Sequence, residues 1–330
     1  MNAPALVNGK PRVLVTRRWP AAVEARLAER FDAVFNTHDR PLRSAEFRDA
    51  LSHYDAILPT VTDGLGPEAM GVATAKTRML ANYGVGYSHI DLESARNLGI
   101  AVTNTPDVLS ECTADLAMTL MLMIARRAGE GERELRSGNW TGWRPTHMVG
   151  AKVSGKVLGI VGFGRIGQAM AQRAHHGFGM KVLVQNRSAV AQPVLDRYGA
   201  TQVQTLEDML PQCDFVSLHC PGGAANRHLI NARRLNLMGP DAFLINTARG
   251  EVIDEHALIQ SLMFETIGGA ALDVFDGEPK VANDLMDCDR LVMLPHLGSA
   301  TRETREAMGF RVLDNLTAFF EGRDPPDLVA

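Results

Sequence analysis

The stretch "VLGIVGFGRIG", residues 157–167, decides the fold of this 330-residue chain. An apolar run typical of a buried strand leads directly into Gly162, Gly164 and Gly167, which have the G-x-G-x-x-G spacing. The spacing alone is a weak signal, but a strand before it and a helical pattern from Ile166 onward are what a dinucleotide-binding turn requires. The first glycine permits a tight turn, the second lets a pyrophosphate approach the backbone, and the third lets the helix pack on the strand. The stretch therefore predicts a dinucleotide site at the start of a helix.

Short β-branched runs alternate with helical patterns on both sides of this stretch. One series runs from residue 12 to about residue 105, and a second starts at Lys156. A long helix, about Leu109 to Arg127, and a polar segment with glycine and tryptophan separate the two series. Strands that alternate with helices form a parallel sheet with helices on its faces. We therefore expect an α/β protein with two such units in tandem, and a last helix over about residues 301–321 that packs back on the first unit.

The bulk composition narrows the classes of partner. With 45% hydrophobic and 22% charged residues, the chain is typical of a globular protein of about two domains. A net charge of −4 gives no general basic field, so neither nucleic acid nor a membrane is an expected partner. Four cysteines without C-x-x-C spacing and the lack of a secretory h-region suit a cytoplasmic protein. Because His175 and His176 are adjacent, they do not share a helix face, and we expect no metal site.

The strand after the glycine turn ends in an unusual way for an NAD site. Such a site has an acid about twenty residues on, where it hydrogen-bonds the ribose. Here Asn186 takes that place, followed by Arg187 and Ser188. An acid would repel a 2′-phosphate, whereas arginine offers a planar fork and serine a hydroxyl donor. The sequence predicts a preference for NADPH, with NADH still possible; the alternative is a solvated loop in which Arg187 is incidental.

Flanking motifs point to a known family. "NYGVGYSHID" (82–91), "NTARGEVIDEHAL" (246–258), "GAALDVFDGEP" (269–279) and "LPHLGSATRETREAM" (294–308) resemble the D-isomer-specific 2-hydroxyacid dehydrogenases, most closely the glyoxylate/hydroxypyruvate reductase branch. The resemblance runs in consistent order from about residue 50 to the C-terminus. It implies two Rossmann-like or flavodoxin-like parallel-sheet domains with a cleft between them. Residues 1–104 and the returning helix, 299–330, would form the substrate domain, and residues 105–298 the NAD(P)-binding domain of a homodimer.

The resemblance also assigns catalytic residues. Arg249 of "TARG", Glu278 of "DGEP" and His296 of "PHLGS" match the positions that act as a unit on a 2-oxo acid. It implies that His296 donates a proton to the carbonyl oxygen, Glu278 holds the imidazole, and Arg249 binds the substrate carboxylate. Taken singly, each residue is more typical of a loop or a surface ion pair. All three follow expected strand ends, where open α/β sheets place their ligands, and this favours the catalytic reading.

Further contacts carry over by position. Free N–H groups at Val85 and Gly86 would form an anion nest for the substrate carboxylate, or would simply belong to a glycine-rich turn. The remaining residues implied to contact the cofactor are Thr113, Arg165, Ile166, Cys220, Pro221, Thr247, Ala248, Gly298 and Asp273, the last of these at the nicotinamide carboxamide. Asn226 stands where relatives usually carry a threonine or similar residue, so no cofactor contact is expected from it. Phe310 stands where some hydroxypyruvate reductases carry a tryptophan, which weakens the case for hydroxypyruvate.

The function expected from these observations is an NADPH-preferring reductase of small 2-oxo acids, converting glyoxylate and hydroxypyruvate to glycolate and D-glycerate. Two alternatives stay open. One is a D-2-hydroxyacid dehydrogenase for a bulkier substrate such as 2-ketogluconate or phenylpyruvate, and the other is a corepressor-like module gated by a nucleotide. Formate dehydrogenase is disfavoured by Glu278, because removal of hydride from formate needs no acid–base pair.

Overall fold

The computed structural model describes residues 9–330, which form two compact units. The first unit runs up to Leu109 and includes Ala300–Ala330, and the second is Ser110–Ser299. The first boundary therefore lies five residues beyond the expected residue 104. The reason is local, since the N–H of buried Thr105 donates to the carbonyl of Gly84 at 3.1 Å and keeps this stretch with the first unit.

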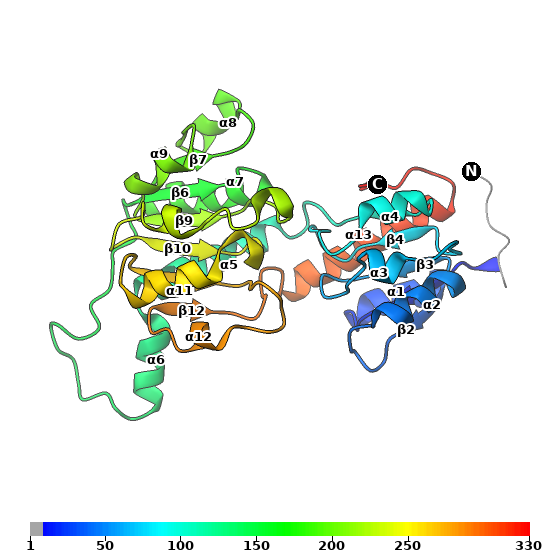
Figure 1. Cartoon of the computed structure of the whole chain (residues 1–330), viewed down its shortest axis with the longest axis horizontal. Coiled ribbons are helices and arrows are strands. Elements are labelled where there is room, and N and C mark those ends of the chain that lie inside the picture. Colours follow the sequence, from blue (N-terminus) through cyan, green and yellow to red (C-terminus); the bar gives the residue numbers. More distant parts are fainter. Residues whose placement is uncertain (1–8) are drawn as a thin grey trace. The chain divides into compact units, whose positions relative to one another are not determined.

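The first unit has a five-stranded parallel sheet in the order β2-β1-β3-β4-β5, the flavodoxin-like order. Its strands are β1 Arg12–Val15, β2 Asp32–Phe35, β3 Ala56–Leu58, β4 Met79–Ala81 and β5 Ala101–Thr103, and its helices are α1 Ala21–Arg30, α2 Ser44–His53, α3 Pro67–Met70, α4 Leu92–Asn97 and α13 Arg302–Phe320. Helix α13 contacts α1 and β4, so the end of the chain completes this unit (Figure 1). Thr301 caps α13 by accepting the Thr304 N–H at 3.2 Å.

The second unit has a seven-stranded parallel sheet in the order β12-β11-β10-β9-β6-β7-β8. Its strands are β6 Val157–Val161, β7 Lys181–Gln185, β8 Ala200–Gln202, β9 Phe215–Leu218, β10 Phe243–Asn246, β11 Gly269–Leu272 and β12 Leu291–Met293. Its helices are α5 Ser110–Ala125, α6 Ala128–Arg136, α7 Arg165–Gln172, α8 Gln192–Arg197, α9 Leu206–Met209, α10 Ala232–Leu235, α11 Glu255–Met263 and α12 Asn283–Met286. Strand order reverses between β6 and β9, which is where a doubly wound sheet binds ligands.

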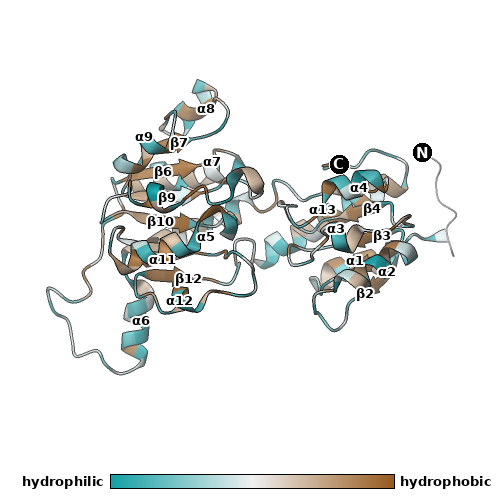
Figure 2. Ribbon diagram, in the orientation of Figure 1, coloured by the Kyte–Doolittle hydropathy of each residue, from teal (hydrophilic) through white to brown (hydrophobic). Residues whose placement is uncertain are grey.

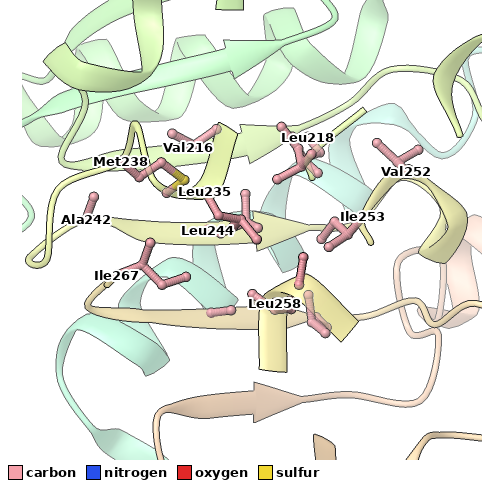
Figure 3. Packing of buried hydrophobic residues seen from close by; sticks show 14 of the residues in the cluster. Val216, Leu218, Leu235, Met238, Ala242, Leu244, Val252, Ile253, Leu258 and Ile267 are labelled. Carbon is pink, nitrogen blue, oxygen red and sulfur yellow. The ribbon is translucent and has the colours of Figure 1, made fainter. Parts of the chain in front are cut away.

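Both faces of this second sheet are apolar and covered. Along β9, Val216 and Leu218 join one core cluster while Phe215 joins the cluster on the other face, and β10 alternates in the same way. Figure 2 shows the hydrophobic strands in the interior of each unit, and Figure 3 shows Val216, Leu218 and Leu244 packed with Leu258 of α11. A sheet buried on both faces leaves its strand ends as the places for polar chemistry.

Helix α6 was not expected, because the sequence predicted only a longer α5 followed by a loop. No residue of α6 is buried, and the ion pairs Arg127–Glu130 and Arg136–Glu132 lie along it. The helix is short and very polar and buries none of its residues, so its sequence offers few apolar positions from which to recognise it. Together with the chain up to residue 150, α6 extends away from the sheet of its unit (Figure 1). Within residues 9–330, no helix is long and apolar enough to cross a membrane.

Candidate active site

The predicted residues of the second unit gather at the carboxyl edge of its sheet. Except for Thr113 in α5, each follows the end of a strand: the glycine turn follows β6, Asn186–Ser188 follow β7, Cys220 and Pro221 follow β9, Thr247–Arg249 follow β10, Asp273 and Glu278 follow β11, and His296 and Gly298 follow β12. The parallel topology alone brings these segments, far apart in sequence, to one edge.

The three glycines of the turn have different structural reasons. Gly162 has φ +90°, and a Cβ there would lie 2.7 Å from the backbone nitrogen of Cys220. A Cβ on Gly167 would collide with the carbonyl oxygen of Gly162. At Gly164, the residue before α7, no atom lies within 4 Å of the Cβ position. Two glycines therefore allow the turn itself, and Gly164 opens space at the helix N-terminus, where a pyrophosphate would fit.

A pocket of about 460 Å³ adjoins this turn. Of the predicted residues, it is lined by Gly162, Asn186, Arg187, Ser188, Cys220 and Pro221. A second wall of the pocket is formed by Gln204–Glu207 after β8 and by Arg234 of α10, and none of these residues was predicted from the sequence. The position of β8 beside β7 was the available signal, because the end of a neighbouring strand borders the same edge. Asn226 also lines the pocket, although no contact was expected from it.

Asn186 has a structural role that the sequence did not reveal. Its Oδ1 accepts the N–H of Phe163 in the glycine turn at 3.1 Å, and its Nδ2 donates to the carbonyl of Ser188 at 2.9 Å. The amide therefore joins the turn to the loop that follows β7. Arg187 is exposed beside it and makes no hydrogen bond or ion pair with any residue that the structure describes. The guanidinium is thus available to a ligand in the pocket.

His296 and Glu278 form a close pair. The Nδ1 of His296 lies 2.7 Å from Oε2 of Glu278, whose Oε1 accepts the Phe275 N–H at 2.9 Å. Burial raises the pKa of Glu278, but the hydrogen bond and charge of His296, with the Phe275 N–H and Arg249, hold it below its usual value. An ionised carboxylate only accepts hydrogen bonds, so Nδ1 carries a hydrogen and Nε2 is left for proton exchange.

Asp273 organises the segment that carries His296. Its carboxylate accepts the N–H groups of Leu297 at 2.6 Å and Gly298 at 2.8 Å, and its carbonyl accepts that of His296 at 2.9 Å. These bonds hold the backbone at His296 and the two residues after it, and His296 itself has φ +54°, an uncommon conformation for a histidine. Burial raises the pKa of Asp273 to about 6. Thr113 donates to the Gly298 carbonyl at 3.1 Å, so these three residues form one cluster behind His296, and their contact with a cofactor stays a prediction.

Arg249 is a largely buried cation that forms no close ion pair with a described residue. Its NH1 donates to the carbonyl of Ala248 at 2.6 Å, and among residues 9–330 it forms no salt bridge. Burial lowers its pKa, opposed by the charges of Glu278 and Glu251. Burying an unpaired charge is costly, which favours a site that receives an anionic ligand. Near it, the hydroxyl of Thr247 is buried without a hydrogen-bond partner among the described residues, as expected where a polar group of a cofactor binds.

Val85 and Gly86 lie in the first unit, after β4. Asn82 donates through Nδ2 to the carbonyls of Gly84 at 2.9 Å and Gly86 at 3.0 Å, and Asn104 donates to that of Val85 at 2.8 Å. The carbonyls are thus held, while the N–H groups of Val85 and Gly86 donate to no atom in the described part of the chain. Free neighbouring N–H groups are what an anion nest requires. In the same described part, no three His, Cys, Asp or Glu side chains are grouped to hold a metal ion.

Comparison with known proteins agrees with this arrangement. The family described as "D-isomer specific 2-hydroxyacid dehydrogenase, NAD binding domain" matches residues 118–298. The chain is 42% identical to a glyoxylate reductase of Thermococcus litoralis over 97% of both chains, and 41% identical to one of Pyrococcus furiosus over 97% of this chain and 95% of that one.

Solved structures are similar over the same length. A putative D-isomer specific 2-hydroxyacid dehydrogenase from Polaromonas has a TM-score of 0.90 at 35% identity, covering 97% of this chain and 100% of that one. An NADPH-dependent glyoxylate/hydroxypyruvate reductase from Sinorhizobium meliloti, in complex with NADP and malonate, has a TM-score of 0.87 at 35% identity, covering 98% and 97%. The chain therefore belongs to the D-isomer-specific 2-hydroxyacid dehydrogenases, a family of nicotinamide-dependent oxidoreductases.

Proposed function

We propose that this protein is an NADPH-preferring reductase of small 2-oxo acids, acting on glyoxylate and also on hydroxypyruvate. The observation that carries the proposal is the His296–Glu278 pair at 2.7 Å on the same sheet edge as Arg249, which is largely buried and forms no salt bridge with the described residues. One group can exchange a proton and the other can bind a carboxylate, and a 2-oxo acid needs both. The names of the similar archaeal and Sinorhizobium meliloti enzymes support the choice of substrate.

The chemistry assigned to the chain follows from these groups. A bound nicotinamide cofactor supplies the hydride that reduces the carbonyl carbon. Nε2 of protonated His296 donates its proton to the carbonyl oxygen, which becomes the hydroxyl. Glu278 remains ionised on Nδ1 and stabilises the imidazolium before the transfer. Arg249 binds the substrate carboxylate through its planar fork and holds the 2-oxo group in place. In the reverse direction, the neutral imidazole accepts the hydroxyl proton.

The cofactor would be held by the glycine turn, the pocket beside it and Thr247. For the NADPH preference, we expect Arg187→Ala to raise the KM for NADPH about tenfold or more, because a charge-assisted contact to the 2′-phosphate is lost. The KM for NADH should change by less than about threefold. Arg290→Ala, at the opposite edge of the sheet, is the matched control. Equal changes in both KM values would show that Arg187 does not read the 2′-phosphate.

The substrate proposal is tested by initial rates of NADPH and NADH oxidation with glyoxylate, hydroxypyruvate and phenylpyruvate. Faster turnover of glyoxylate with NADPH supports it in full. Turnover with NADH alone would retain the reductase and remove the cofactor preference. Best turnover of phenylpyruvate would favour the dehydrogenase of bulkier acids, and nucleotide binding without turnover of any of the three would favour the corepressor-like module.

A homodimer in the cytoplasm is part of the same proposal. Residues 128–150, which contain α6, expose Leu135, Trp140, Trp143 and Val149, with Trp143 82% exposed. Large apolar side chains gathered on one exposed segment are typical of an interaction surface. We expect the double variant Trp140→Ser/Trp143→Ser to elute as a monomer in size-exclusion chromatography with light scattering, while Phe264→Ser, exposed at the end of α11, remains a dimer. A monomeric parent protein would contradict the proposal.

A further inference from the structure

Two glutamates follow Arg249 in the sequence, and neither has a role in the chemistry above. Glu251 lies in the short helical turn η5, Gly250–Val252, and Glu255 is the first residue of α11. The segment between them is anchored in the core, because Val252 and Ile253 are buried and Asp254 caps α11 by accepting the Ala257 N–H at 3.2 Å. Both glutamates therefore project from a fixed part of the sheet edge.

Glu251 holds the loop that follows β9. Its Oε1 accepts the N–H of Gly223 at 2.5 Å, and Gly223 has φ +96°, a conformation that favours glycine. The preceding glycine is packed against the same group, since a Cβ on Gly222 would lie 2.5 Å from Oε1 of Glu251 and 2.9 Å from Cγ of Arg249. This loop begins with Cys220 and Pro221, which line the cofactor pocket. Glu251 thus holds the loop that forms one wall of the pocket.

Glu255 holds the loop that follows β11. Its Oε1 accepts the N–H of Asp276 at 2.7 Å, and the carboxylate of Asp276 pairs with Arg227 at 2.9 Å. The two segments approach so closely that a Cβ on Gly250 would collide with the backbone of Phe275 and Asp276. Two residues further along this loop is Glu278, whose carboxylate accepts the Phe275 N–H and the His296 hydrogen. The hydrogen bond from Asp276 to Glu255 therefore anchors the loop only two residues before Glu278, the partner of His296.

Glu255 holds the loop as a hydrogen-bond acceptor, and its negative charge is not required for this role. Burial raises the pKa of Glu255; the Asp276 N–H opposes this rise, and the charges of Asp276 and Glu278 add to it. A neutral acceptor of the same shape would make the same hydrogen bond without this repulsion. Glutamine at this position should thus preserve the loop, whereas alanine should release it.

We propose that Glu251 and Glu255 are positioning residues with separate tasks: Glu251 sets the cofactor loop at Pro221–Gly223, and Glu255 sets the loop that presents Glu278 to His296. This inference rests on the proposed function, because it assigns the two loops to cofactor and proton transfer. Its consequence is that the two glutamates, four residues apart, affect different constants, Glu251 the NADPH Kd and Glu255 kcat. A general loss of folding would affect both constants together.

The experiment compares Glu251→Ala, Glu255→Ala, Glu251→Gln and Glu255→Gln with the parent protein. NADPH binding is measured by fluorescence titration, and kcat and KM are measured with glyoxylate. We expect Glu251→Ala to raise the NADPH Kd about tenfold with a smaller change in kcat, and Glu255→Ala to lower kcat about tenfold with the Kd within about threefold. Each glutamine variant should keep the affected constant, the NADPH Kd or kcat, much closer to the parent value than the corresponding alanine variant does. Glu265→Ala, which removes an exposed ion pair at the opposite edge, is the control and should behave like the parent.

The outcomes separate this inference from the function on which it rests. An inactive parent protein would refute the proposed function, yet the NADPH titration would still test Glu251. An active parent with both alanine variants unchanged would overturn the inference alone. Equal losses of Kd and kcat in both alanine variants, with lowered melting temperatures and no recovery in the glutamine variants, would show that the two residues serve only general stability.

Discussion

Replacing His296 with asparagine is expected to lower kcat for glyoxylate reduction by about 10²- to 10⁴-fold, the usual contribution of a positioned general acid. Asparagine suits this position because His296 has φ +54°, and asparagine tolerates the left-handed conformation better than alanine. The bonds from Asp273 to the backbone of this segment should therefore remain. What is lost is Nε2 and its proton, so the fall should appear in kcat while NADPH binding stays close to that of the parent.

The matched control is His256→Asn, an exposed histidine in the first turn of α11. It is expected to leave kcat within about twofold, since surface substitutions away from a site have small effects. A fall in kcat of less than about tenfold for His296→Asn would mean that a different group supplies the proton. A large rise in the NADPH Kd would mean that the segment had moved, and Asp273 would then need to be tested in its place.

Much of the fold could be predicted from local sequence patterns. The glycine turn in "VGFGRIG" lies between an apolar strand and a helix, so it predicts both the Rossmann-like unit and the sheet edge that carries the candidate site. The last helix begins after Thr301 and ends before Gly322, residues typical of helix ends. Helix α6 could not be predicted in this way, because its polar and glycine-containing sequence has no face to bury.

The sequence proposes the members of the candidate site but not the hydrogen bonds that connect them. Resemblance placed Arg249, Glu278 and His296, and the topology brings their segments to one edge. It could not show that Asn186 bonds to the glycine turn or that Glu255 bonds to the loop of Glu278. These bonds run between a side chain and a backbone N–H, and any backbone has that group at every residue except proline. Since nothing in the acceptor's sequence marks the partner, such bonds appear only once the loops are folded together.

Replacing Arg249 with lysine is expected to lower kcat/KM for glyoxylate by about 10²-fold, although the positive charge is kept. Lysine offers a point charge in place of a planar fork, so a carboxylate loses its paired hydrogen bonds and the 2-oxo group loses its alignment. The loss should reside in both KM and kcat, since the same group binds and orients. In the parent, the guanidinium is buried and held by the Ala248 carbonyl, which fixes its direction before a substrate arrives.

Arg290→Lys is the control, because Arg290 forms an exposed ion pair at the opposite edge of the sheet. Both variants are measured with glyoxylate over a full range of concentrations, and NADPH binding is titrated separately. The result that would contradict the assignment is an unchanged kcat/KM for Arg249→Lys. In that event the N–H groups of Val85 and Gly86 become the first candidates for the carboxylate, and variants of Asn82 and Asn104, which hold the carbonyls of that loop, become the next measurement. If kcat/KM falls while the NADPH Kd is unchanged, Arg249 acts on the substrate and not on the cofactor, as expected for a guanidinium that forms no salt bridge with the described residues.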